Sequence, residues 1–157
     1  IGTVGTHEKN EIAKKYGCSE VINYTKQHIQ KELMNITNQE GLPVVYDGVG
    51  KVTMVKSLMC LKMRGTFVSF GNASGKLDPV DVGKLISPKG LYLTRPSIAH
   101  YTSTREELDE ASKKLFEMIK SGNVKINLYK KYKLEDTIQA HKDLEGRKII
   151  GPAIITP

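Results

Sequence analysis

Residues 43–75, PVVYDGVGKVTMVKSLMCLKMRGTFVSFGNASG, decide the fold that the sequence predicts. The apolar run at 44–46 is β-branched and aromatic, which is typical of a buried strand. From Val52 the apolar residues recur at steps of three and four, which predicts a helix that ends at Arg64-Gly65. Residues 66–70 have the pattern of a second strand. A strand, a helix and a strand within about 30 residues form a βαβ unit, whose strands run parallel.

Glycine-bearing loops follow both predicted strands, at residues 47–50 and 71–75. Ligands of open parallel sheets bind outside the carboxyl ends of the strands, and glycine lets a ligand approach the backbone closely. Either loop alone is better explained as a tight turn, because short glycine motifs are weak evidence. Two such loops at one edge of the sheet nevertheless favour a ligand-binding face.

The rest of the chain alternates between the two kinds of periodicity. Extended segments are expected at 1–4, 20–24, 90–94, 124–132 and 148–155. Helices are expected at 7–16, 26–37, 81–86 and 104–120, and from 134 to Gly146, with a loop at 97–103. In the helix at 104–120, a capping box of Thr104 and Glu107 marks the start. Its inward-facing residues should be Leu108, Ala111, Leu115, Met118 and Ile119. The alternation predicts the α/β class, with a Rossmann-like, mostly parallel sheet flanked by helices.

Length and composition are those of a soluble globular protein. With 157 residues, 39% of them hydrophobic and 26% charged, the chain is long enough for one domain with a sizeable core. It has no apolar run long enough to span a membrane and no signal-peptide pattern. Cys18 and Cys60 are best explained as reduced structural thiols, so we expect a cytoplasmic protein, and no Cys/His cluster has the spacing of a metal site.

The net charge of +7, with an isoelectric point near 9.3, raises the question of a nucleic-acid partner. The lysines are spread over predicted helices and mixed with acidic residues, and no aromatic residues are interleaved with them. Solvated helix faces explain this charge better, so we expect no nucleic-acid partner.

The N-terminal unit of strand and helix bears on the choice of cofactor. If residues 1–16 are the second βα unit of a Rossmann sheet, an NAD site would place a carboxylate at the strand end to bind the ribose 2′-hydroxyl. Gly5 and Thr6 stand there instead, and Lys9 follows in the first helical turn. A hydroxyl, helix N–H groups and an ammonium suit a 2′-phosphate. Lys9 alone is more simply a solvated lysine, but together with the missing acid these residues favour NADP(H).

Six segments along nearly the whole chain resemble the zinc-free quinone oxidoreductases, the ζ-crystallin-like branch of the medium-chain dehydrogenase/reductases. They are IGTVGTHEK, AKKYGCSEVINYT, VVYDGVGKVT, KSLMCLKMRGTFVSFGNASG, KGLYLTRPSIAHYTSTREEL and HKDLEGRKIIGPAIITP. The run LTRPS with HYTSTREEL, and LEGR with its IIxP-like ending, are specific to this branch. The resemblance implies a metal-independent reduction of quinones or related enones by NADPH, whose nicotinamide supplies the hydride chemistry.

The resemblance also assigns cofactor-binding residues. At the adenosine end it implies that Gly5, Thr6 and Lys9 meet the 2′-phosphate, that Tyr24 lines the adenosine site, and that Arg147 adds a second cation. A helix-terminal charge is the simpler explanation of Arg147 alone. On the nicotinamide side it implies contacts from Gly48, Phe70, Gly71, Asn72 and Ser74, with Gly48 in place of the serine of the family's YDSVG pattern. It assigns no catalytic acid, base or nucleophile.

Under this resemblance, residues 1–157 are part of an NADP-binding Rossmann domain that lacks the first βα unit, and a segment at about 124–157 packs back onto it. Neither the family's glycine-rich turn nor its N-terminal GroES-like substrate domain is found in this sequence, which opens on a strand pattern without an initiator Met. We therefore expect a longer parent enzyme, an NADPH:quinone reductase, and at best weak cofactor binding by this chain alone.

The alternative is a truncated, non-catalytic module that self-associates, because a sheet without its central strand leaves unpaired edges. Relatives of this kind associate through a sheet edge, so a homodimer is expected under either reading.

Overall fold

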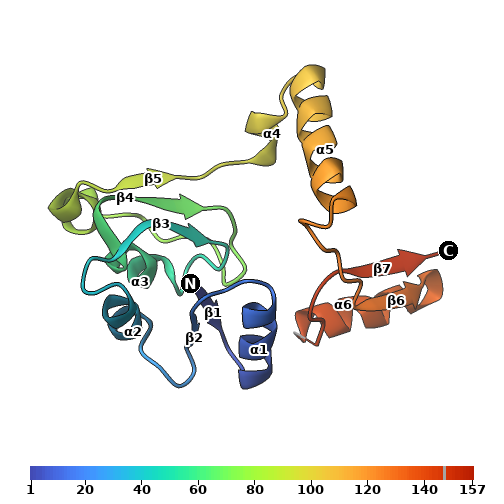
Figure 1. Ribbon diagram of the computed structural model, residues 1–157, viewed down its shortest axis with the longest axis horizontal. Helices are drawn as coiled ribbons and strands as arrows, with labels where there is room; N and C mark the ends of the chain where they lie inside the picture. The colour runs from blue at the N-terminus through green and yellow to red at the C-terminus, as the bar shows by residue number, and fades with distance from the viewer. Residues whose placement is uncertain (147) are drawn as a thin grey trace. The chain divides into compact units, whose positions relative to one another are not determined.

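The computed structural model describes residues 1–146 and 148–157. They form two compact units, unit 1 with residues 1–98 and unit 2 with residues 99–157. All the strand pairs are parallel, and helices connect most of the strands, so the predicted α/β arrangement of parallel strands flanked by helices is confirmed (Figure 1). The strands form three small sheets rather than one.

Unit 1 contains two of these sheets. In the first, β1 (Gly2–Val4) pairs with β2 (Val21–Asn23), and α1 (His7–Lys15) connects the two strands. The second sheet has the order β3-β4-β5, and its strands lie side by side in Figure 1. Its strands are β3 (Leu42–Asp47), β4 (Leu61–Ser69) and β5 (Tyr92–Thr94).

The expected βαβ unit is present, but the expected end of its helix is wrong. Helix α3 (Met54–Met59) stops five residues before Arg64, and β4 begins at Leu61. Lys89 accounts for this early end, because its ammonium donates to the carbonyl oxygens of Met59 at 3.0 Å and Leu61 at 2.6 Å. Arg64 instead has a φ of 58° at an irregularity within β4.

That irregularity shifts the register between β3 and β4. Leu42 pairs with Leu61, whereas Val44 pairs with Thr66, so five steps along β4 oppose two steps along β3. A β-bulge of this kind absorbs the extra residues and turns the strand locally. The Arg64-Gly65 pair therefore marks a bulge rather than a helix end.

The core of unit 1 lies between α3 and the three-stranded sheet. Its buried cluster consists of Met54, Leu58, Leu61, Phe67 and Leu91. A second cluster joins Ile22 of β2 to Leu33 of α2 (Ile29–Ile36) and to Cys60. Burying a side chain of this size stabilises a fold by about 1.5–3 kcal/mol, so these clusters hold the strand ends in place.

The helices expected at 26–37 and 81–86 are present with different bounds. Helix α2 begins three residues later than expected, because His28 is its N-cap and accepts a hydrogen bond from the Lys31 N–H. The short helix expected at 81–86 is a π-helix, η1 (Val82–Ile86), followed by a 3₁₀ turn, η2 (Ser87–Lys89). A four-residue helix, α4 (Ile98–Tyr101), stands where a loop was expected.

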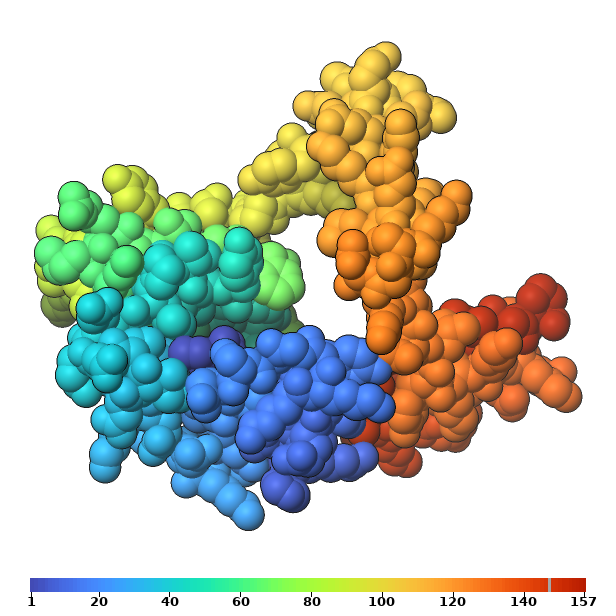
Figure 2. All heavy atoms as spheres, in the orientation of Figure 1, coloured from blue at the N-terminus to red at the C-terminus, as the bar shows by residue number. Residues whose placement is uncertain are grey.

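The long helix α5 (Arg105–Lys120) lies in unit 2, and its predicted capping box is confirmed. The Thr104 hydroxyl oxygen accepts from the Glu107 N–H, and the Glu107 carboxylate accepts from the Thr104 N–H. The inward face predicted for this helix is mostly wrong, because Leu108, Leu115 and Met118 are each 45–50% exposed and Ala111 is exposed as well. Only Ile119 of the predicted set is half-buried. The orange atoms of α5 can be followed in the space-filling view (Figure 2).

The rest of unit 2 is a compact strand, helix and strand. Strand β6 (Lys130–Lys133) pairs in parallel with β7 (Ala153–Thr156). Between them lie η3 (Leu134–Asp136) and α6 (Thr137–Glu145), with Gly146 as the C-cap of α6. Among the described residues, no helix is long and apolar enough to cross a membrane.

Candidate functional site

The two glycine loops of unit 1 follow the carboxyl ends of β3 and β4 and bind each other through the backbone. The Phe70 N–H donates to the Asp47 carbonyl at 3.0 Å, the Ala73 N–H to the Gly48 carbonyl at 3.2 Å, and the Ser74 N–H to the Val49 carbonyl at 2.8 Å. We call residues 47–50 together with 70–75 the double loop.

Side chains add to this backbone pairing. The Ser74 hydroxyl donates to the Val49 carbonyl at 2.8 Å and accepts from the Val52 N–H at 3.1 Å. Within residues 70–75, the Asn72 backbone carbonyl accepts from the Gly75 N–H at 2.9 Å. The structure thus gathers in the double loop all the residues that the sequence assigns to the nicotinamide side, namely Gly48, Phe70, Gly71, Asn72 and Ser74.

Two of these glycines touch. A Cβ atom at Gly71 would lie 2.5 Å from the Gly48 carbonyl oxygen and 2.9 Å from the Gly48 Cα, both backbone atoms that cannot swing away. At Gly48 itself, a Cβ would meet the Phe70 ring at 2.9 Å. The ring therefore lies over Gly48, and it is 59% exposed. The double loop presents to solvent a flat aromatic face next to a close backbone contact.

Asp47 underlies this arrangement, and the sequence reasoning did not assign it a role. It is only 4% exposed, and its carboxylate accepts hydrogen bonds from the N–H groups of Val49 and Gly50 and from the hydroxyls of Thr53 and Ser57. Burial by itself raises the pKa of Asp47, but these hydrogen bonds outweigh it and hold the pKa below its usual value. The sequence did contain a signal for this role. Asp47 stands at a strand end, where an Asp side chain can accept from the N–H groups two and three residues further on.

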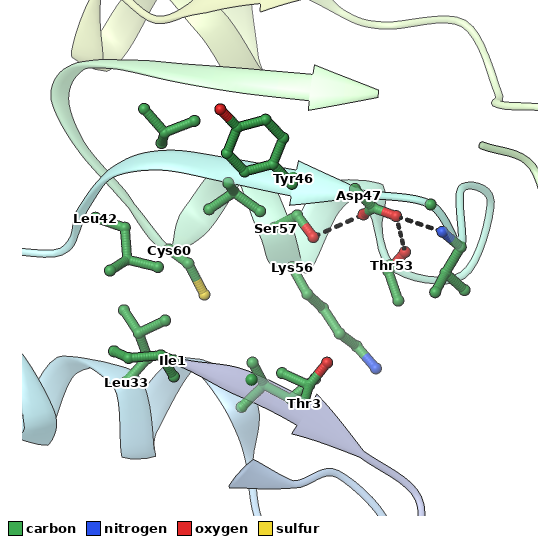
Figure 3. Close-up of a pocket in the computed structure, with 16 residues that line it drawn as sticks. Ile1, Thr3, Leu33, Leu42, Tyr46, Asp47, Thr53, Lys56, Ser57 and Cys60 are labelled. Atoms are coloured by element: carbon green, nitrogen blue, oxygen red, sulfur yellow. Dashed lines mark hydrogen bonds between the residues drawn. The ribbon is translucent and has the colours of Figure 1, made fainter. Parts of the chain in front are cut away.

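A pocket of about 450 Å³ lies beside Asp47, between β1 and β3 (Figure 3). The two strands run in the same direction on opposite sides of it, and its wall includes apolar side chains such as Leu33, Leu42 and Cys60. Lys56 extends from α3 across the pocket toward β1 (Figure 3). In the described part of the chain, β1 pairs only with β2 and β3 only with β4, so each strand has an unpaired edge.

The residues expected at the adenosine end form a second group, at the carboxyl ends of β1 and β2. The Tyr24 hydroxyl lies over Gly5, where a Cβ would meet it at 2.7 Å. Thr6 is the N-cap of α1, and its hydroxyl oxygen accepts from the Lys9 N–H at 3.3 Å. Gly5, Thr6, Lys9 and Tyr24 thus lie around the N-terminus of α1. An exposed Glu8 shares that first turn.

Two further expectations concern charge and metals. Arg147, expected as a second cation, lies outside the described residues. Among the residues that are described, no group of three or more His, Cys, Asp or Glu side chains could hold a metal ion. Cys18 and Cys60 are free thiols.

Residues 1–120 match the model of a protein family described as zinc-binding dehydrogenase. The chain belongs to the zinc-binding dehydrogenase family. The matched range contains both glycine loops and the N-terminus of α1.

Two curated relatives align with the whole of this chain. Quinone oxidoreductase 1 of Escherichia coli is 45% identical over 159 residues, which cover 100% of this chain and 49% of that protein. The 2-haloacrylate reductase of a Burkholderia species is 43% identical over 158 residues, covering 100% of this chain and 47% of that protein. The chain spans about half the length of these relatives.

Among solved structures, the Escherichia coli quinone oxidoreductase complexed with NADPH is 45% identical to this chain, with a TM-score of 0.95. The alignment covers 100% of this chain and 49% of that one. The resemblance to quinone oxidoreductases that the sequence indicates is therefore confirmed.

Proposed function

We propose that this chain is the nucleotide-binding part of an oxidoreductase that transfers reducing equivalents from NADPH to quinones or related enones. The observation that carries the proposal is the match of the whole chain to half of a quinone oxidoreductase that was solved with NADPH. When bound, the nicotinamide supplies the hydride, and the protein supplies binding and orientation.

At the adenosine end, the N-terminus of the nine-residue helix α1 supports a 2′-phosphate site. The Thr6 hydroxyl oxygen accepts from the Lys9 N–H, so its own proton is available to a phosphate oxygen. No carboxylate stands at Gly5 or Thr6, and within the described residues no ion pair engages the Lys9 ammonium. The Glu8 carboxylate offsets one positive charge at this helix end. A second cation, the role expected of Arg147, would therefore strengthen the binding of the 2′-phosphate.

At the nicotinamide end, the double loop supports the proposal by its shape. Because Gly48 and Gly71 carry no side chains, the nicotinamide ring can lie directly against the backbone where the two residues touch. The exposed Phe70 ring lies next to this contact. Exposed backbone and an aromatic face hold a planar group by contact and exclude water from one side of it. We assign these residues to binding and orientation and none to proton transfer.

For the whole protein, we propose that residues 1–157 act as part of an NADP-binding Rossmann domain, with residues 124–157 packed back onto it and a GroES-like domain supplying the substrate side. We further propose a cytoplasmic homodimer. The free thiols support a reducing compartment. The exposed Tyr92 and Leu93 on β5, the last strand of its sheet, support association through that edge.

One observation favours the second candidate, a non-catalytic module that self-associates. The edges of β1 and β3 face one mostly apolar pocket, and both are unpaired in the described chain. Unpaired edges of this kind recruit further strands. Light scattering over a range of concentrations tests it, because a clean monomer at all of them contradicts both self-association and the proposed homodimer.

The test of the proposed function is a titration of the chain with NADPH and with NADH, followed by nicotinamide fluorescence. We expect NADPH to bind more tightly than NADH. Lys9→Ala and Arg147→Ala should each weaken NADPH binding by about tenfold and change NADH binding little, because each removes one charge-assisted contact with the 2′-phosphate. Lys120→Ala, which removes a lysine from α5, is the matched control.

Two outcomes would contradict the proposal. Absence of binding by either nucleotide would remove the cofactor role from this chain. Equal affinity for NADPH and NADH, unchanged in both variants, would remove the 2′-phosphate site and with it the preference for NADP(H).

A further inference from the structure

Asp47 is a buried carboxylate that the proposed function does not use, and its hydrogen bonds are unusually complete. Oδ1 accepts from the N–H groups of Val49 at 2.8 Å and Gly50 at 2.9 Å, and from the Thr53 hydroxyl at 3.0 Å. Oδ2 accepts from the Ser57 hydroxyl at 2.8 Å. In the described part of the chain no ion pair includes Asp47. Its negative charge is therefore balanced by dipoles alone.

These four bonds fix the first half of the double loop. They hold Val49 and Gly50 under the end of β3 and tie the loop to Thr53, the N-cap of α3, and to Ser57 within that helix (Figure 3). Gly50 adopts a φ of 91°, which is open to glycine and costly for other residues. The course of residues 47–50 is thus set by one side chain.

The second half of the double loop takes its position from the first. The carbonyl oxygens of Gly48 and Val49 accept the N–H groups of Ala73 and Ser74, about 25 residues further along the chain. The Ser74 hydroxyl adds a further bond to the Val49 carbonyl. A change in the direction of those two carbonyls therefore removes the bonds that hold Ala73 and Ser74 against the first half of the loop.

We propose that Asp47 is a positioning residue that sets the shape of the double loop and thereby the site for the nicotinamide end of the dinucleotide. Buried and fully bonded, it makes no contact with the nucleotide itself and acts through Val49 and Gly50. The inference rests on the proposed function and deepens it, because it names the residue on which the nicotinamide half of the site depends.

Substitutions at Asp47 test whether the loop depends on the hydrogen bonds of this side chain or on its negative charge. Asn keeps an oxygen that accepts from Val49, Gly50 and Thr53, and its NH₂ group donates to the Ser57 oxygen, which reverses its role. Asp47→Asn therefore preserves the loop, and Asp47→Ala removes all four bonds. Thr53→Val removes one of the four bonds to Asp47, together with the longer bond from the Thr53 hydroxyl to the Gly50 carbonyl at 3.2 Å, with little change of shape. It guards against an Asp47→Ala chain that does not fold. Asp143→Ala, which deletes the buried carboxylate of unit 2, is the matched control.

The first measurement is amide hydrogen exchange at Ala73 and Ser74, without nucleotide. We expect exchange to accelerate by about tenfold in Asp47→Ala and by about threefold in Thr53→Val, and to stay near the wild-type rate in Asp47→Asn and Asp143→Ala. Unchanged exchange at both amides in Asp47→Ala and in Thr53→Val would overturn the inference, since the second half of the loop would then not depend on the first.

The second measurement is a titration with NADPH and with 2′-phospho-ADP-ribose, which is the same nucleotide without nicotinamide. Asp47→Ala should weaken NADPH binding by about tenfold and leave the analogue within about threefold, whereas Asp47→Asn should bind both like the wild type. Equal loss of both ligands, or loss of neither, would overturn the inference alone. Failure of the wild-type chain to bind either ligand would instead overturn the proposed function, and this inference with it.

Discussion

Two buried aspartates, one in each unit, show two different ways to keep a carboxylate inside a protein. Asp47 in unit 1 is 4% exposed and Asp143 in unit 2 is 6% exposed. The partners of Asp47 are backbone N–H groups and hydroxyls. Asp143 accepts from the Tyr132 hydroxyl and the Gln139 amide, both at 2.8 Å, and lies 3.3 Å from the Lys130 ammonium and 3.6 Å from the Lys148 ammonium.

The difference in partners gives the two residues different tasks. Dipoles from neighbouring backbone stabilise the Asp47 charge, so that carboxylate dictates the path of a loop. Side chains and cations on separate elements stabilise the Asp143 charge, and Lys130 also lies 4.5 Å from the centre of the Tyr132 ring. Asp143 therefore fastens α6 to β6. A buried carboxylate next to glycines shapes a surface, whereas one among lysines holds elements together.

The largest expected effect comes from breaking the unit 2 network. Asp143→Ala leaves the Tyr132 hydroxyl without its acceptor and Lys130 and Lys148 without their anion, so we expect the melting temperature to fall by about 5 °C or more. Asp143→Asn should cost less but still clearly destabilise, because an amide does not neutralise two lysines. Thermal unfolding followed by circular dichroism measures both.

Asp47→Asn is the comparison that decides whether the two sites differ. No lysine is paired with the Asp47 carboxylate, so the melting temperature of Asp47→Asn should stay close to that of the wild type. An equal fall in melting temperature in Asp47→Asn and Asp143→Asn would contradict the view that dipoles stabilise one carboxylate and cations the other.

A smaller loss of stability is expected when a methyl group is added within the double loop. Gly71→Ala places Cβ 2.5 Å from the Gly48 carbonyl oxygen, so the loops must separate, at a cost of about 1–3 kcal/mol in the free energy of unfolding. Gly83→Ala is the control, because its Cβ would meet only the Asp81 side chain, at 3.4 Å. Urea unfolding of both variants measures the difference, and a Gly71→Ala chain as stable as Gly83→Ala would show that the close approach imposes no constraint.

The smallest effect is the dependence of stability on pH. Hydrogen bonds from Tyr132 and Gln139, ahead of the charge of Lys130, lower the pKa of Asp143 to about 2 from its usual 3.8. Because the pKa of the folded state lies below that of the unfolded state, this stabilisation is complete above about pH 4 and is lost as the pH falls toward 2. The difference in melting temperature between wild type and Asp143→Asn should therefore shrink over that interval. A constant difference down to pH 2 would contradict the lowered pKa.

The sequence predicted features that depend on neighbouring residues. The capping box of Thr104 and Glu107 needs only backbone three residues away, and it is confirmed. The predicted end of α3 was wrong because Lys89, about 30 residues further on, binds the Met59 and Leu61 carbonyls. The sequence around Arg64 carries no pattern that indicates this contact. The apolar spacing of α5 gave its period correctly, but period alone does not say whether another element covers that face.

By itself, the sequence determined the α/β alternation, the parallel direction of the strands and the glycine loops at strand ends, since periodicity and turn chemistry act over a few residues. Only the tertiary structure decided that the two glycine loops would bind each other, that Gly71 would touch Gly48, and that the Asp47 carboxylate would gather four donors beneath them. Those contacts depend on the register of β3 against β4. That register is set by packing around Phe67 and by a bulge in β4, through interactions between residues that are distant in the chain.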